Sequence, residues 1–181
     1  RELNEEAVGA GRQPIALHVG IGLNTGICCV GNMGSAQRFD YSALGDDVNL
    51  ASRLEGQCKT YGAATILGTG TWEGVADGFT TLELDLIRVK GKKEPERIYA
   101  LLPMPADPAR FAAFAARHAA MLSAYRERRW DDALALAAAC RGEAEPFGLA
   151  DLYTEFEGRI GAFRKDPPPP DWDGVHVSLS K

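Results

Sequence analysis

The two residues best suited to do chemistry in this chain are Asn49 and Arg53, in the run D-D-V-N-L-A-S-R that starts at Asp46. Residues four apart lie on one helical face, so both side chains can reach the same small polar ligand. A guanidinium offers a fixed fork of donors that suits phosphate oxygens. Taken as isolated residues, the pair has a simpler interpretation, namely a solvated amide and an exposed charge paired with Asp46 or Glu55.

A helix is expected to position this pair. Asp46 or Asp47 is the predicted N-cap and Gly62 the predicted C-cap. Apolar residues recur at helical spacing on a different side and should face the core: Val48, Ala51, Leu54 and Cys58. The glycines that begin at Gly31 predict a hairpin loop and a short strand before the helix.

The surrounding segments predict an α+β fold. Residues 15–23 and 27–30 are expected to form a β-hairpin around the turn Asn24-Thr25-Gly26. After the helix we expect a strand over 64–67, a helical turn over 71–76, and strands over 79–89 and 97–102. The last two flank the basic turn K-G-K-K, which by itself is only a charged hairpin tip.

The whole stretch G-N-M-G-S-A-Q-R-F-D-Y-S-A-L-G-D-D-V-N-L-A-S-R, from Gly31 to Arg53, closely resembles the second half of a class III nucleotidyl cyclase domain. This family makes cyclic AMP or cyclic GMP. The resemblance covers about residues 1–103. It implies an α+β, ferredoxin-like cyclase domain that lacks its first strands.

The resemblance also implies a role for each matched residue. Asn49 would orient the nucleotide, and Arg53 would stabilise the transition state. In the basic turn, Lys90 is the first choice for gripping the terminal phosphates, with Lys92 in reserve. Arg38 would add a second phosphate contact.

Ser42 occupies the position that reads the purine edge in this family. Mammalian-type adenylate cyclases carry Asp there, guanylate cyclases usually a small residue such as Cys, and a bacterial branch of adenylate cyclases Ser or Thr. A hydroxyl both donates and accepts, so its chemistry leaves adenine and guanine open. The resemblance favours ATP, converted to 3′,5′-cyclic AMP and diphosphate, with guanylate cyclase as the alternative.

The family binds two Mg²⁺ or Mn²⁺ ions through two aspartates on strands that this sequence does not contain. Asp46 and Asp47 are expected to be caps and Asp85 to lie within a strand, so we expect no metal ligand in the chain. Because the family's sites form between two domains, a homodimer or a partner cyclase domain should complete the site. The fragment alone is expected to be inactive. A non-catalytic dimerisation or interaction module is the alternative.

From residue 104 onward the composition becomes Ala-rich and helical. We expect a helical extension over 104–166 and a Pro-rich tail over 167–181, in which Trp172 anchors a rigid polyproline spacer. A pattern around Trp130 is typical of one tetratricopeptide hairpin. A helical stripe that includes Phe114 and His118 predicts packing on the cyclase domain more strongly than a partner-binding groove.

Composition narrows the remaining possibilities. The net charge of −5 and the lack of a long basic tract argue against nucleic-acid binding. Four cysteines without a C-x-x-C spacing favour reduced thiols and a cytoplasmic location. No apolar run approaches 18 residues, so a membrane anchor would have to lie upstream.

Overall fold

The computed structural model describes residues 19–35, 38–89, 91–92 and 94–178. In chain order, the elements are β1 (Ile21–Leu23), β2 (Cys29–Ser35), β3 (Arg38–Leu44), α2 (Asp46–Tyr61), β4 (Thr65–Gly68), α3 (Thr69–Val75), β5 (Thr81–Val89), β6 (Glu96–Leu101), α4 (Pro108–Arg126), α5 (Trp130–Ala144), the 3-10 turn η1 (Glu145–Phe147), α6 (Ala150–Lys165) and β7 (His176–Ser178). The expected α+β class is confirmed.

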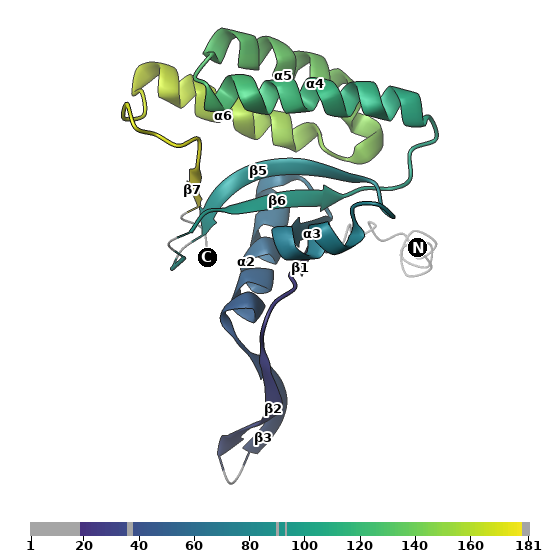
Figure 1. Cartoon of the computed structure of the whole chain (residues 1–181). Coiled ribbons are helices and arrows are strands. Elements are labelled where there is room, and N and C mark those ends of the chain that lie inside the picture. The colour runs from purple at the N-terminus through teal and green to yellow at the C-terminus, as the bar shows by residue number, and fades with distance from the viewer. Residues whose placement is uncertain (1–18, 36–37, 90, 93, 179–181) are drawn as a thin grey trace, which may run out of the picture.

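A curved five-stranded sheet forms the centre of the fold. Its strand order is β1-β4-β6-β5-β7, with β4, β6 and β5 antiparallel and the two outer pairings parallel. Helices α4, α5 and α6 form a layer along the β5 side of the sheet, and α3 lies beside β6 (Figure 1). Helix α2 shares the buried core with this layer and contacts α6 through Tyr61 and Arg159. The helix that carries the predicted site therefore packs directly against the C-terminal helices.

Residues 15–18 of the predicted hairpin lie outside the described residues, and for the described part the predicted pairing of 15–23 with 27–30 is wrong. β1 pairs in parallel with β4, with Ile21 opposite Thr65, while β2 pairs with β3 as an antiparallel hairpin. After β1, Asn24 donates hydrogen bonds of 3.2 Å to the backbone and carboxylate oxygens of Asp47, which directs the chain along the start of α2. Alternation identified strands here, but it carries no information about which strand is the partner.

Helix α2 ends at Gly62 as predicted, in the left-handed conformation, but its start differs from the prediction. The N-cap is Gly45, and Asp46 and Asp47 lie in the first turn without capping it. Their carboxylates instead bind a lysine and an asparagine from other segments. The core face also differs in part, because Val48 and Ala51 are only half-buried. The buried residues are Leu50, Leu54, Gln57, Cys58 and Tyr61.

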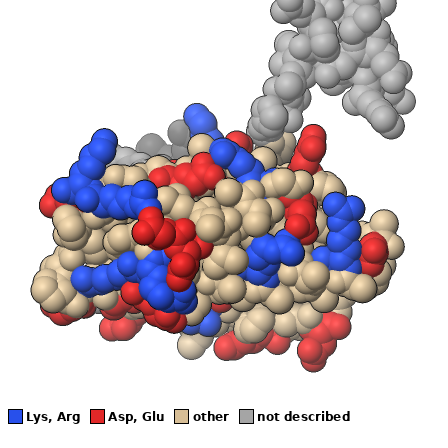
Figure 2. All heavy atoms as spheres, turned by 90° about the horizontal axis from the view of Figure 1, so that it is seen from above, with Lys and Arg blue, Asp and Glu red and all other residues tan. Residues whose placement is uncertain are grey.

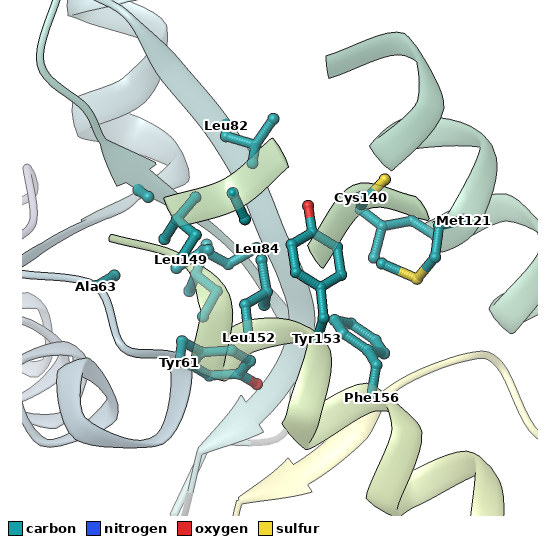
Figure 3. Close-up of a cluster of buried hydrophobic side chains, with 14 of the residues drawn as sticks. Tyr61, Ala63, Leu82, Leu84, Met121, Cys140, Leu149, Leu152, Tyr153 and Phe156 are labelled. Atoms are coloured by element: carbon teal, nitrogen blue, oxygen red, sulfur yellow. The ribbon is translucent and has the colours of Figure 1, made fainter. Parts of the chain in front are cut away.

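The C-terminal helices share one hydrophobic core with the sheet and α2 (Figure 3). Leu82 and Leu84 of β5 contribute from the sheet, and Tyr153 and Phe156 of α6 contribute from the helical layer. All four are at most 4% exposed. The helical stripe therefore packs on the sheet; the tetratricopeptide-like character stays a prediction.

A C-terminal strand was missed by the sequence analysis. β7 pairs in parallel with the end of β5, and the Pro-rich segment before it brings Trp172 onto the aromatic side chains of α4–α6. A strand of three residues is too short to give a periodic signal. The expected aromatic anchor is present.

The outward face of the helical layer carries both signs of charge, interspersed over its surface (Figure 2). Ion pairs also join neighbouring helices of this layer, for example Arg117 with Glu143 and Arg141 with Glu157. Within the described residues, no helix is long and apolar enough to cross a membrane.

Candidate active site

Helix α2 presents the predicted pair away from the core. Leu50 and Leu54, four residues apart, are at most 2% exposed and fix the rotation of the helix against the sheet. Asn49 and Arg53 precede each of them by one position and therefore lie on a neighbouring stripe. Asn49 is exposed and Arg53 half-buried. The structure thus keeps both side chains on one face, as predicted.

Arg53 lies against the turn that follows β5. A Cβ built on Gly91 would be 3.3 Å from Nη2 of Arg53, and Gly91 has φ +84°, which favours glycine. The Nη1 nitrogen of Arg53 is buried and has no hydrogen-bond partner among the described residues. A buried, unpaired guanidinium nitrogen is costly, and a phosphate oxygen is the acceptor that it fits best.

Lys92 attaches the same turn to the start of α2. Its Nζ lies 2.8 Å from Oδ2 of Asp46, and its backbone N–H donates to the carbonyl of Val89 at 3.1 Å. The Lys92 side chain is 19% exposed, whereas that of Asp46 is 72% exposed. Lys92 therefore lies beside the N-terminal half of α2, which also carries Arg53, and its charge is already shared with a carboxylate.

The other predicted residues are only partly placed. Ser42 lies on β3 opposite Gly31, half-buried, three residues before the N-cap of α2. Arg38 begins β3, but its side chain lies outside what the structure describes. Lys90 also lies outside the described residues. The structure brings together Arg53, Gly91 and Lys92, and it puts Ser42 on the hairpin that leads into α2.

The described residues contain no group of three or more His, Cys, Asp or Glu side chains that could hold a metal ion. Asp46 and Asp47 are engaged by Lys92 and Asn24, and Asp85 is buried in an ion pair with Arg159. These carboxylates do not fit Mg²⁺ or Mn²⁺. The chemistry of the described site is that of amide, guanidinium and ammonium groups.

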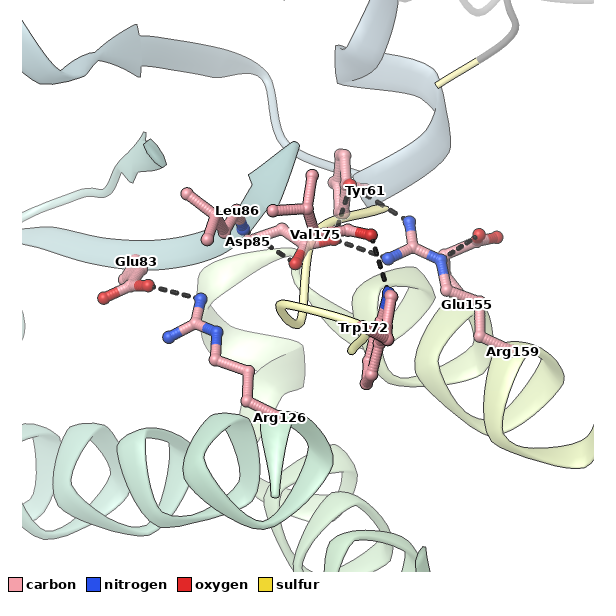
Figure 4. A network of polar contacts seen from close by, with 9 residues as sticks. All are labelled: Tyr61, Glu83, Asp85, Leu86, Arg126, Glu155, Arg159, Trp172 and Val175. Carbon is pink, nitrogen blue, oxygen red and sulfur yellow. Dashed lines mark hydrogen bonds and ion pairs between the residues drawn. The ribbon is translucent and has the colours of Figure 1, made fainter. Parts of the chain in front are cut away.

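A buried polar network connects the site helix to the helical layer (Figure 4). Oδ2 of Asp85 on β5 accepts hydrogen bonds from the hydroxyl of Tyr61, at the end of α2, and from Arg159 on α6. Nη2 of Arg159 also donates to the Tyr61 hydroxyl at 3.0 Å. Burial raises the pKa of Tyr61 well above its usual value, so this hydroxyl stays protonated and donates. The network holds together the two elements, α2 and β5, that carry or precede the site residues.

Sequence reasoning missed two contributors to this site. Asp46 was interpreted as a cap, although it is the ionic partner of Lys92. Asn24 was assigned to a simple turn, although it fixes the loop after β1 to Asp47. Both contacts join residues far apart in the sequence. A local sequence pattern cannot reveal such contacts. The contact between Asp46 and Lys92 could have been suggested only by an alignment to a known fold in which the basic turn lies beside α2.

The family model for the adenylate and guanylate cyclase catalytic domain matches residues 4–103. The chain belongs to this family. The matched range includes α2, the β2–β3 hairpin and the turn after β5, and it ends before the C-terminal helices.

Curated relatives match a similar part of the chain. The terminal-differentiation-specific adenylate cyclase of Dictyostelium discoideum is 38% identical over 90 residues, which cover 48% of this chain and 4% of that protein. Adenylate cyclase 1 of Rhizobium meliloti is 35% identical, over 45% of this chain and 12% of the relative. The adenylate cyclase of Anabaena cylindrica is 35% identical, over 46% and 17%. The chain thus spans less than a fifth of the length of these relatives.

Solved structures give similar matches. The adenylyl cyclase CyaB from P. aeruginosa is 32% identical, with a TM-score of 0.49, over 59% of this chain and 53% of that one. The guanylyl cyclase Cya2 is 32% identical, with a TM-score of 0.45, over 60% and 53%.

Proposed function

We propose that this chain supplies the nucleotide-orienting and phosphate-stabilising half of a cyclase site that converts ATP to 3′,5′-cyclic AMP and diphosphate. The observation that carries the proposal is the buried, unpaired Nη1 of Arg53 beside the turn at Gly91–Lys92. Family membership supports the reaction class. The names of the curated relatives, together with Ser42 at the base-reading position, favour ATP over GTP.

In the proposed reaction, the ribose 3′-oxygen attacks the α-phosphorus, loses its proton and displaces diphosphate. Asn49 would hold the nucleotide in the orientation for attack, and Arg53 would donate to the oxygens on which negative charge increases. Lys90, with Lys92 as a second candidate, would bind the leaving phosphates, and Arg38 would add a further phosphate contact. Ser42 would contact the purine edge.

A partner is part of this proposal. The described carboxylates do not fit the divalent ions on which the family generally depends, so their ligands would come from outside the described residues. A homodimer or a second cyclase domain would supply them. Apolar side chains around the β2–β3 hairpin support an assembled state, because Ile27 is 92% and Tyr41 76% exposed.

The test replaces Arg53 in the complete protein. Arg53→Ala should lower kcat by roughly a hundredfold or more, as expected for the loss of one donor to a developing oxyanion. Arg53→Lys, which keeps the charge without the fork, should recover only part of the rate. Lys59→Ala, an exposed substitution in the last turn of the same helix, is the matched control and should leave kcat unchanged.

Unchanged turnover in Arg53→Ala would refute the assigned role. Nucleotide choice is measured separately by assaying ATP and GTP side by side with the complete protein. Higher kcat/KM for GTP would replace the adenylate assignment with guanylate cyclase, while leaving the role of Arg53 intact.

A further inference from the structure

The last residues of β5 depend on the C-terminal strand for their position. In the β5–β6 pairing, the register ends with Ile87 opposite Glu96. The next two residues, Arg88 and Val89, pair with Val177 and Ser178 of β7. The turn at Gly91–Lys92 follows almost at once, so β7 is the strand that extends order from the sheet to this turn.

Val89 takes part both in the β5–β7 pairing and in the turn that follows β5. It pairs with Ser178 in the sheet, and its carbonyl accepts the hydrogen bond from the Lys92 backbone N–H that closes the turn. Beyond the turn, Lys92 binds Asp46 at the start of α2, and Gly91 lies against Arg53. A continuous set of contacts thus connects the C-terminal strand to the guanidinium of the site.

The segment that leads into β7 packs against the C-terminal helices. Trp172 packs its ring against Tyr125, Trp130 and Phe163, with centroid distances of 5.4, 6.1 and 5.2 Å. Its indole Nε1 donates to the carbonyl of Val175 at 3.0 Å, and Val175 itself is buried. This local ring of contacts fixes the direction in which the chain enters β7.

Gly174, in the same segment, packs closely against α4. Its φ is +80°, and a Cβ there would lie 2.8 Å from Cγ of Arg126 on α4. Asp173 accepts from the Val175 backbone N–H at 3.1 Å and also pairs with Arg88 of β5 at 3.4 Å. The tail is therefore attached to both the helical layer and β5.

We infer that the segment from Trp172 to Ser178, here called the tail clamp, is a positioning element of the nucleotide site. It holds the turn at Gly91–Lys92 against Arg53 so that both can engage the phosphates of one nucleotide. The inference rests on the proposed function, because it assumes that this turn and Arg53 bind the same ligand. In this inference the clamp residues act through the turn, not by contacting the nucleotide.

The test compares kcat and KM for ATP in the complete protein. Trp172→Ala removes the anchor and should raise KM for ATP by roughly tenfold, the effect of a weakened charge-assisted phosphate contact, with a smaller change in kcat. Trp172→Phe keeps an aromatic ring in the cluster and should restore most of the affinity. Val177→Pro perturbs β7 itself while the Val177 side chain is half exposed, and should reproduce the rise in KM.

Trp72→Ala is the matched control, because Trp72 stacks on Tyr99 at 4.3 Å and lies outside the clamp. It should lower the melting temperature without changing KM, because a smaller folded fraction reduces the amount of active enzyme and not its affinity. If Trp172→Ala and Val177→Pro behave like this control, the clamp is merely stabilising and the inference is wrong. The Arg53 variants test the proposed function separately, so a negative result here leaves that function standing.

Discussion

The β2–β3 hairpin and the end of β5 both lead to the candidate site, yet they are supported in opposite ways. The hairpin projects away from the body of the molecule (Figure 1). Its strands and the preceding loop expose large apolar side chains: Ile27 at 92%, Val30 at 54%, Tyr41 at 76% and Leu44 at 58%. The end of β5 has buried residues, Ile87 and Val89, and is flanked by β7.

The difference separates what this chain stabilises by itself from what it leaves to another surface. Around β5, apolar burial and a buried ion pair hold the proposed phosphate side of the site in place. Around β3, which carries Ser42, the apolar side chains named above are exposed, and the proposed base-reading side has no comparable support. We therefore expect a partner to cover the hairpin, whereas the C-terminal segments of this chain cover the end of β5.

The largest expected effect comes from a substitution in the region around β5, which this chain stabilises by itself. Arg159→Met should lower the free energy of unfolding by about 3–5 kcal/mol, because it leaves the fully buried Asp85 carboxylate without its ionic partner. The measurement is a denaturant titration of this chain. Arg164→Met, on the same helix but in an exposed pair with Asp131, should cost about 1 kcal/mol or less.

A double variant sharpens the same comparison. Replacing the pair together, as Asp85→Leu with Arg159→Met, should recover much of the loss, because no buried charge then lacks a partner. Equal effects of the single Arg159 and Arg164 variants would show that the buried network does not fasten α6 to β5.

A second prediction uses pH on the same region. Burial lowers the pKa of His118 from about 6.5 to about 4, while its ring contacts the Glu83 carbonyl and the Tyr153 hydroxyl. The unfolded chain therefore binds a proton between these pH values that the folded chain does not. The contribution of neutral, buried His118 to the free energy of unfolding is therefore fully present above pH 6.5. It is lost as the pH falls towards 4, by up to about 3 kcal/mol.

The check compares unfolding free energies of the natural chain and His118→Gln from pH 7 to pH 4.5. The variant should show a flatter decline. His176 on β7 also has a pKa lowered by burial, so His176→Gln serves as a separate variant for its share. Parallel declines in the natural chain and His118→Gln would assign the acid sensitivity to carboxylates.

The sequence predicted elements better than it predicted their contacts. The spacing of Leu54 and Cys58 predicted α2, and Gly62 predicted its end, because helical spacing and a C-terminal glycine act locally. The pairing of β1 with β4 was missed, since strand periodicity does not name a partner. For the site, residue types and the family resemblance singled out Asn49 and Arg53. The placement of Gly91 against Arg53 could not be predicted, because it depends on how β5, β7 and α2 pack together.

The smallest expected effect on stability, and the sharpest contrast, comes from the hairpin. Tyr41→Ser should change the unfolding free energy by no more than about 0.5 kcal/mol, because the side chain is 76% exposed. If the hairpin is an interface, the same change should weaken self-association, since a large aromatic contact area is lost from it.

Sedimentation velocity at micromolar concentration measures this directly. We expect the natural chain to form dimers or larger species, and Tyr41→Ser to shift the distribution towards monomer. Phe79→Ser is the matched control, because Phe79 is 59% exposed but lies outside the hairpin; it should leave the distribution unchanged. A monomeric natural chain, or equal shifts for both variants, would contradict the assignment of the hairpin as the partner-binding region.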